Sequence, residues 1–241
     1  MAIIMMGLMI GTIGMISGAG MKIYPIADAY VQNRNTADKN TNYGSCVTNP
    51  SYCQDLRVGY NINYGTDISY LKFDLNNLSG KTVNSAVLSI FGHTDPISSV
   101  SLNMNLVTAG WAENTITWNN KPSNGSLMIS KSISSSYTGR VNFTINSSYL
   151  NGSQLSFALI ATNSEDVKFY SREYNDEPYR PYLYVDYTGT GISCNTTADT
   201  SSDGKVSMSE LLSYISQWKS GSVGMGNLLN AIGYWKAGVG C

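Results

Sequence analysis

Apolar and polar residues alternate in short runs through most of the chain between residues 21 and 188. A period of two with one buried face is typical of strands in an antiparallel sheet. Gly, Asn, Asp and Pro clusters separate the runs, and no long helical pattern intervenes. The pattern predicts an antiparallel β-sandwich of jelly-roll type over residues 21–188. Four runs show it most clearly: Leu71, Phe73 and Leu75; Leu102, Met104 and Leu106; Val141, Phe143 and Ile145; Leu183 and Val185.

The periodicity becomes helical in residues 191–241, where the chain repeats itself with an offset of 17 residues. Each copy carries one apolar helical stripe, so the segment predicts two packed helices that form a small separate module. The stripes are Leu211, Leu212, Ile215 and Trp218, and then Leu228, Leu229, Ile232 and Trp235. Four further residues either form a partner surface or complete the small core: Met208, Tyr214, Met225 and Tyr234.

The first twenty residues carry no charge and are long enough, as a helix, to cross one hydrocarbon core. One interpretation is a secretory signal peptide that ends near Ala19 and Gly20, although the usual positive start is missing. The other is a retained helix, because glycines recur at spacings of 4, 3 and 4 and permit close helix packing. A retained helix would be a membrane anchor or the core of a filament. These glycines are Gly7, Gly11, Gly14 and Gly18.

Composition narrows the function. The 241 residues include 15 Lys and Arg against 16 Asp and Glu, a net charge of -1, so no nucleic-acid partner is expected. Charged residues make up 13% of the chain, about half the share of an average globular protein. There is one histidine, His93, and no G-x-S-x-G elbow accompanies it, which argues against serine hydrolase chemistry.

Cysteines and glycosylation triplets point to an oxidising compartment. The four cysteines fall into two local pairs, Cys46 with Cys53 and Cys194 with Cys241, without metal-type spacing. We therefore expect two disulfides and an extracellular or cell-surface location. Six N-x-S/T triplets supply candidate glycosylation sites: Asn77, Asn124, Asn142, Asn146, Asn151 and Asn195.

Residues 199–210 fit the twelve-residue calcium loop of an EF-hand. Side-chain oxygens stand at positions 1, 3, 5, 9 and 12, a carbonyl at 7, and the turn glycine at 6 is Gly204. Ca²⁺ is the expected cofactor, since it prefers six to eight hard oxygen ligands. No helix precedes the loop, and the arrangement resembles a dockerin, although the second copy has no calcium loop. The expected ligands are Asp199, Ser201, Asp203, Lys205, Ser207 and Glu210.

Ordered segments of the central region resemble a known family. They are Asp28-Ala-Tyr-Val31, Asn42-Tyr-Gly44, Leu56-Arg-Val-Gly59, Tyr70-Leu-Lys-Phe-Asp-Leu75, Trp111 to Pro122, Phe169 to Glu173, and Arg180 to Leu183. In order and spacing they resemble the DNRLRE domains, which are akin to family 96 carbohydrate-binding modules and to disaggregatase-related archaeal proteins. The resemblance implies a jelly roll on an archaeal-type surface protein, and also suggests a structural Ca²⁺ near Asp28 and Asp186.

Aromatic and acidic residues of these segments have two interpretations each. Trp111 and Trp118 either stack on sugar rings or pack in the core, and burial is the usual fate of such side chains. Glu113 and Glu173 form either an acid/base pair or ion pairs with Arg172 or Arg180. The residues favour packing and ion pairs in both cases.

The sequence thus favours a non-catalytic surface protein that binds a glycan or the surface matrix through its jelly roll. Its calcium-stabilised tail spans residues 191–241. A structural subunit of an extracellular filament, pilus or sheath, built from copies of the chain around residues 1–20, is the first alternative. A polysaccharide lyase or hydrolase is the second. A membrane is expected as a partner only through residues 1–20, if they are retained.

Overall fold

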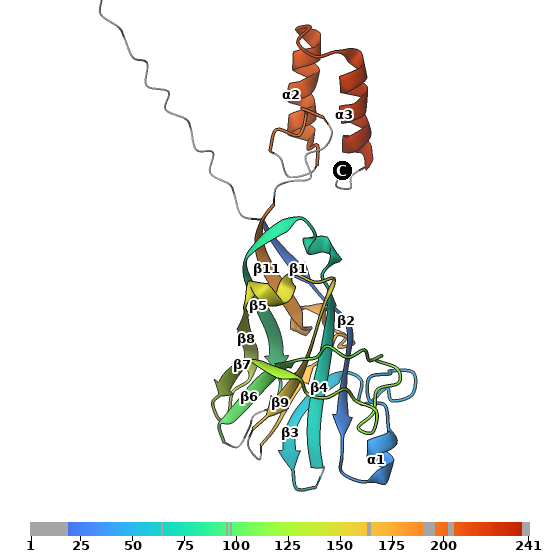
Figure 1. Cartoon of the computed structure of the whole chain (residues 1–241), viewed down its shortest axis with the longest axis vertical. Coiled ribbons are helices and arrows are strands. Elements are labelled where there is room, and N and C mark those ends of the chain that lie inside the picture. Colours follow the sequence, from blue (N-terminus) through green and yellow to red (C-terminus); the bar gives the residue numbers. More distant parts are fainter. Residues whose placement is uncertain are drawn as a thin grey trace, which may run out of the picture.

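Two bodies make up the described part of the chain, a body of strands and a pair of helices (Figure 1). The computed structural model describes residues 19–63, 65–94, 96, 98–162, 165–189, 196–201 and 205–237. Eleven strands are β1 (Ala19–Ile23), β2 (Pro25–Gln32), β3 (Asp55–Asn61), β4 (Gly65–Asp74), β5 (Lys81–Gly92), β6 (Val100–Leu106), β7 (Ser126–Ile133), β8 (Gly139–Ile145), β9 (Gln154–Ala161), β10 (Asp166–Tyr170) and β11 (Tyr182–Gly189). The helices are α1 (Thr36–Asn40), α2 (Met208–Lys219) and α3 (Met225–Ala237), with 3-10 turns at Asn76–Leu78, Ser147–Leu150 and Glu177–Tyr179.

All strand pairs are antiparallel, and they form two layers joined at the β3–β4 hairpin. One layer runs β2-β4-β9-β6-β7. The other contains β1, β11, β5 and β8, with β10 and β3 continuing it. Leu71 and Phe157 from the first layer and Leu88 and Leu183 from the second lie in one buried cluster. The predicted β-sandwich is therefore confirmed.

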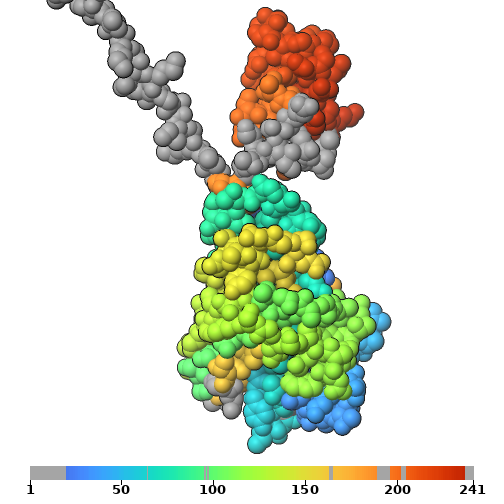
Figure 2. Space-filling model, in the orientation of Figure 1, coloured from blue at the N-terminus to red at the C-terminus, as the bar shows by residue number. Residues whose placement is uncertain are grey.

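The two layers differ in what covers their outer faces. In β4, Leu71 and Phe73 face the main core, whereas Ile68 and Tyr70 belong to a second buried cluster outside it. The long segment between β6 and β7 supplies Trp111 and other members of that cluster, so it covers this layer from outside. Figure 2 shows the green and yellow-green parts of the chain spread over the side in view. The outer face of the layer that contains β5, β10 and β11 carries aromatic side chains.

The sandwich begins two residues earlier than the alternation predicts. Ala19 and Gly20 belong to β1, paired with Tyr187 and Asp186 of β11. Residues 1–18, which hold most of the segment interpreted as a signal peptide or a retained helix, lie outside the described residues. Over the described ranges, no helix has the length and apolar character needed to cross a membrane.

The C-terminal helices agree with the repeat. Helices α2 and α3 contact each other, and Leu211 and Leu228 occupy the same repeat position in their small buried core. Tyr214 is buried with them, so it is a core residue. Met208 and Met225, by contrast, stay more than half exposed.

A buried carboxyl makes the sandwich sensitive to pH. Asp67 of β4 is 3% exposed, and burial raises its pKa to about 7 against an ordinary value near 3.8. The folded state therefore keeps this proton up to about pH 7, whereas the unfolded chain loses it near pH 4. Between these values the folded state binds more protons, so its stability falls as pH rises.

We predict that Asp67→Asn flattens this pH dependence. The substitution removes the cost of the buried charge, so the free energy of unfolding at pH 8 should rise by about 2 kcal/mol and that at pH 4 should hardly change. Urea unfolding at both pH values measures this. The exposed Asp176→Asn is the matched control and should leave both curves in place. Equal stabilisation at the two pH values would contradict the argument.

Candidate functional site

Aromatic side chains gather on the outer face of the layer that contains β5, β10 and β11. On β11, Leu183 and Val185 point into the core, and the alternate residues Tyr182 and Tyr184 point outward. The same alternation sends Phe91 of β5 and Tyr170 of β10 outward. We call this surface the aromatic face. It comprises Tyr24, Phe91, His93, Tyr170, Tyr174, Tyr179, Tyr182 and Tyr184.

The rings contact one another in two groups, and the Arg140 guanidinium lies over one ring of each, Phe91 and Tyr182. Tyr170 stacks on Tyr174 with ring centroids 3.7 Å apart and on His93 at 4.2 Å. Phe91 lies 5.8 Å from Tyr170 and meets the edge of Tyr179 at 4.7 Å. Tyr179, Tyr24 and Tyr184 are each 37–42% exposed. The aromatic face is thus a preformed platform, because ring contacts of this kind hold the side chains in place.

Arg140 and Lys22 bring positive charge to the aromatic face. The Arg140 guanidinium lies 4.7 Å from the Tyr182 ring centroid, and the Lys22 ammonium lies 4.5 Å from it. Arg140 also donates to the Ser89 hydroxyl at 3.2 Å and to the carbonyl oxygens of Pro178 and Arg180. It therefore fixes the turn before β11 against β8 and keeps Tyr182 in position.

Two further details concern Tyr184 and Tyr170 of this face. Tyr184 crosses the backbone at Gly20, where an added Cβ would stand 2.1 Å from the tyrosine oxygen. A larger residue at Gly20 would therefore displace the exposed tip of the Tyr184 ring. The hydrogen bond with Tyr174, together with burial, raises the pKa of Tyr170 to about 12. The Tyr170 hydroxyl is accordingly neutral at physiological pH.

Such a surface can stack on sugar rings and hydrogen-bond their hydroxyls, since tyrosine has an apolar ring and a polar tip. His93 closes one end of the group around Tyr170, and its Nε2 lies 3.2 Å from Asp55 Oδ1. His93 thus contributes a stacked ring held by an acid.

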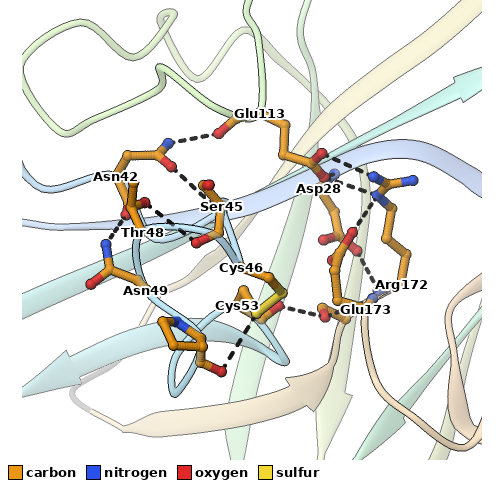
Figure 3. Close-up of a disulfide and its surroundings, with 12 residues drawn as sticks. Asp28, Asn42, Ser45, Cys46, Thr48, Asn49, Cys53, Glu113, Arg172 and Glu173 are labelled. Atoms are coloured by element: carbon orange, nitrogen blue, oxygen red, sulfur yellow. Dashed lines mark hydrogen bonds and ion pairs between the residues drawn. A yellow bond between two sulfur atoms is a disulfide. The ribbon is translucent and has the colours of Figure 1, made fainter.

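A second constellation joins three acids to one arginine (Figure 3). Arg172 donates to both carboxylate oxygens of Glu113, at 2.9 and 3.0 Å, and lies 2.6 Å from Glu173 Oε1. Asp28 accepts from the Arg172 backbone N–H at 2.8 Å and donates its own N–H to Glu113 at 2.9 Å. The ion-pair interpretation of Glu113 and Glu173 is therefore confirmed, with Arg172 as the partner. Arg180 donates instead to the Tyr174 carbonyl.

Burial shapes the charge of this constellation. It raises the pKa of Asp28 well above its ordinary value, and the neighbouring Glu173 carboxylate adds to the shift. Asp28, Glu113 and Glu173 each offer one oxygen within 4.8 Å of the others, so they could hold a cation. Asp186, suggested with Asp28 as a calcium ligand, is not in this group. Because Arg172 engages both Glu113 oxygens, that carboxylate is not free to relay protons.

The same constellation anchors the cysteine loop. Cys46 and Cys53 form the predicted disulfide, with Cα atoms 5.1 Å apart. Ser171 donates to the Cys53 carbonyl at 2.6 Å. Asn42 donates to the carbonyl oxygens of Glu113 and Ile116 at 2.6 and 2.8 Å (Figure 3). The loop, the covering segment and the end of β10 thus hold one another. The second pair, Cys194 and Cys241, lies outside the described residues.

The two tryptophans considered for sugar stacking do not form an open platform. Trp111 is 9% exposed, contacts Tyr70 and donates its indole N–H to the Ser156 hydroxyl at 2.8 Å. Trp118 packs partly buried against the same cluster, beneath the Lys121 ammonium. Both rings fasten the covering segment, which agrees with the packing interpretation that the sequence favours.

Part of the predicted calcium loop is described. Asp199 and Glu210 are both buried, and Ser201 bridges them. Its N–H donates to Glu210 at 2.7 Å, and its hydroxyl lies 3.3 Å from Asp199. Although burial opposes it, N–H donation from Ser207 and Ser201 lowers the pKa of Glu210 to about 2. Loop positions 1, 3 and 12 therefore lie close together, and both oxygens of the Glu210 carboxylate accept hydrogen bonds, from Ser201 and from Ser207. Asp203 and Gly204 lie outside the described residues.

The asparagines of the N-x-S/T triplets differ in their exposure to solvent. Asn124 is half-buried and accepts a hydrogen bond from the Tyr70 hydroxyl at 3.2 Å, whereas Asn195 lies outside the described residues. The remaining four are exposed: Asn77, Asn142, Asn146 and Asn151.

Sequence reasoning missed the aromatic face. Its signal is present, because Tyr182 and Tyr184 alternate with Leu183 and Val185 and so must lie on the opposite side of the strand. That pattern alone does not show whether the opposite side of the strand faces solvent or packs against a second layer. The sequence offers the tryptophans as candidates for sugar stacking because they belong to the more recognisable motif.

The sequence of this chain matches a known protein family. A model of carbohydrate-binding module family 96 matches residues 19–187, which include all but two residues of the eleven-stranded body. No curated protein matches the chain.

Removing the arginine should destabilise the sandwich. Arg172→Met leaves three neighbouring carboxyl groups without their cation, so we expect the free energy of unfolding at pH 7 to fall by roughly 2–3 kcal/mol. Chemical denaturation measures the loss. Arg180→Met, which removes a donor to a carbonyl instead, should cost about 1 kcal/mol. Adding Glu113→Gln to Arg172→Met should restore part of the loss. Equal losses in the two arginine variants would refute the role of the ion pairs.

Proposed function

The chain belongs to carbohydrate-binding module family 96, and from this premise we propose that it binds a polysaccharide on the aromatic face without cleaving it. The observation that carries the proposal is the two groups of partly exposed rings, Tyr24 with Tyr182 and the group around Tyr170, with Arg140 between them and Lys22 beside Tyr182. A polysaccharide offers repeated apolar ring faces and hydroxyls, which match rings with polar tips.

The distribution of acids supports binding over catalysis. The acids considered for acid/base chemistry, Glu113 and Glu173, are held by Arg172, and their corner also fixes the disulfide loop. On the aromatic face, Glu177 accepts from the Tyr24 hydroxyl, and Asp55 lies against His93 and Arg57. These acids have structural partners, so a binding role is the better account of the surface.

We further propose that the protein works outside the cell or at its surface. The Cys46–Cys53 disulfide supports this, because such bonds persist in oxidising compartments. Exposed asparagines in N-x-S/T triplets, such as Asn77 and Asn151, are available for glycosylation. The ligand would then be a surface or matrix polysaccharide.

The C-terminal module is proposed to bind one Ca²⁺ through the predicted loop. Support comes from the spacing of residues 199–210 and from the convergence of Asp199, Ser201 and Glu210. When bound, Ca²⁺ would neutralise the buried carboxylates and tie the loop to the start of α2. A module of this size has a small core, so such a ligand stabilises it usefully.

Tyr182→Ala should weaken polysaccharide binding at least about tenfold, because it removes the ring that contacts Tyr24, Arg140 and Lys22. Binding is measured by affinity electrophoresis and calorimetry on a panel of soluble polysaccharides. Trp118→Ala is the matched control, since it removes an aromatic ring from the opposite layer, and it should bind as the unmodified chain does. Loss of binding in the Trp118 variant with retention in the Tyr182 variant would move the site to the other layer.

Calcium should raise the stability of the module. At a free Ca²⁺ concentration about one hundred times the Kd, the gain is about 2.7 kcal/mol, and EDTA should abolish it. Glu210→Gln should lower Ca²⁺ affinity at least about tenfold, because the bidentate ligand is lost. Asn227→Gln alters the equivalent position of the second repeat, outside the loop, and should have no effect. Calcium titrations followed by calorimetry decide the matter; no heat of binding in the unmodified chain would refute the site.

A further inference from the structure

Polar side chains from three strands share one face of the sheet near the β3–β4 hairpin. Asp67 of β4 lies opposite Gln32 of β2 on one flank and opposite Gly59 of β3 on the other. Gly59 lies in turn opposite Asp166 of β10. Opposed residues carry their side chains on the same face of a sheet, so these positions form one row with no side chain at Gly59. We call Gln32, Asp67 and Asp166 the polar row.

The next row along the same strands brings a tyrosine and two cations beside the polar row. Tyr30 lies opposite Ser69, and Arg57 lies opposite Lys168. The Ser69 hydroxyl donates to the Arg57 carbonyl at 2.7 Å, and the Arg57 guanidinium lies 5.1 Å from the Tyr30 ring centroid. Arg57 also lies 3.3 Å from Asp55 Oδ2, so it already has a carboxylate partner outside the polar row.

These two rows leave buried polar atoms without partners. Asp67 and Gln32 are each 3% exposed, and Tyr30 is fully buried. Within the part of the chain that the structure describes, no hydrogen bond reaches Asp67 Oδ1, Asp166 Oδ1 or Gln32 Nε2. Among the same described residues, the Tyr30 hydroxyl and Arg57 Nε also have none. Buried polar atoms are normally paired, so five unpaired atoms on one face indicate a partner that the chain itself does not supply.

The carboxyl groups of the polar row also lack a matching positive charge. Burial raises the pKa of Asp67 to about 7, and it also raises the pKa of Asp166. The charge of Asp166 adds to the shift of Asp67, whereas Arg57 and Lys168 oppose the shift without cancelling it. The cations of the chain therefore leave the two carboxyl groups incompletely neutralised.

We propose that the polar row binds a Ca²⁺ ion, separate from the loop of residues 199–210. Its protein ligands are a carboxylate oxygen of Asp67, a carboxylate oxygen of Asp166 and the amide oxygen of Gln32. Ca²⁺ prefers oxygen ligands of these kinds and completes its shell with water. Rotation of the Gln32 amide exchanges its nitrogen for its oxygen, so this side chain can serve as a ligand. Water around the ion gives the Tyr30 hydroxyl and Arg57 Nε the partners they lack.

The site is weak, and it connects the two layers of the sandwich. Only two carboxylates face the ion, and Arg57 and Lys168 repel it, so we expect a Kd of about 10⁻⁴–10⁻³ M, as in extracellular calcium modules. This affinity suits a protein that works outside the cell, as proposed above. Because β2 and β4 belong to one layer and β10 to the other, the ion ties both layers together near the hairpin.

Calcium titration of the full chain in a Glu210→Gln background tests this site apart from the loop. Ca²⁺ at about ten to one hundred times the Kd should raise the unfolding midpoint of the sandwich by roughly 3–10 °C. Asp67→Asn and Asp166→Asn, each added separately, should weaken Ca²⁺ binding at least about tenfold in calorimetry. Asp176→Asn is the matched control, because it removes an exposed acid from another part of the body, and it should bind as the background does.

The ion also changes what Asp67→Asn does to stability. In EDTA at pH 8 the substitution should raise the unfolding midpoint, because it removes a buried charge that nothing neutralises. In saturating Ca²⁺ the background gains stability and the variant does not, so the advantage of the variant should shrink or reverse. A carboxyl group with a purely structural role would give the same difference in both conditions.

Tb³⁺ luminescence supplies a readout that does not depend on the folding of the aspartate variants. Tb³⁺ replaces Ca²⁺ in oxygen sites, and a neighbouring tyrosine transfers excitation energy to it. The Glu210→Gln chain should therefore give Tb³⁺ emission on excitation of tyrosine, and Ca²⁺ should displace it. Tyr30→Phe should lower the emission at least about twofold, because Tyr30 lies beside the polar row.

Three results would overturn the proposal. The first is a Glu210→Gln chain that shows neither a Ca²⁺-dependent midpoint nor displaceable Tb³⁺ emission. The second is binding that survives both Asp67→Asn and Asp166→Asn. The third is loss of binding on Asp28→Asn with the polar row intact, which would move the ion to the constellation around Arg172. The site depends neither on polysaccharide binding nor on the loop, so failure of those proposals leaves this test unchanged.

Discussion

The ion pair between Glu113 and Arg172 is the contact on which the arrangement of the sandwich depends. It fastens the segment between β6 and β7 to the end of β10, and Asp28 joins both through backbone hydrogen bonds. The fastened segment brings Trp111 onto Tyr70, so the outer face of the β4 layer becomes a second core. Because such a buried group of charges is costly unless its members are matched, the arginine carries more of the architecture than its partial exposure indicates.

The other layer, which contains β5, β10 and β11, carries aromatic side chains on its outer face. The strands β5, β10 and β11 use alternate residues for the shared core, and their outward residues are aromatic with polar tips. Packing among those rings, with Arg140 fixed by carbonyl oxygens at the edge, gives a rigid surface before any ligand arrives. Preorganisation of this kind reduces the entropy lost on binding, which is the main obstacle for weakly interacting sugars.

The sequence predicts the sandwich and the helix pair well, because a period of two and a 17-residue repeat are local signals. It could not say which outer face is covered, because that depends on where a long segment with little regular structure folds back. Trp111 and Tyr182 illustrate the limit. Both are aromatic and both stand in recognisable motifs, yet only the tertiary position of the covering segment buries the first and leaves the second accessible.

In the helix pair, too, the sequence does not determine which of two neighbouring apolar residues is buried. Leu211 and Leu212 are adjacent and equally apolar, and helical periodicity admits both to one broad stripe. The segment 197–201 decides between them, because its contact with Glu210 turns Leu211 inward and leaves Leu212 on the far side. A short segment outside the two helices thereby determines which of their apolar side chains are buried, and no local pattern in the helices carries that information.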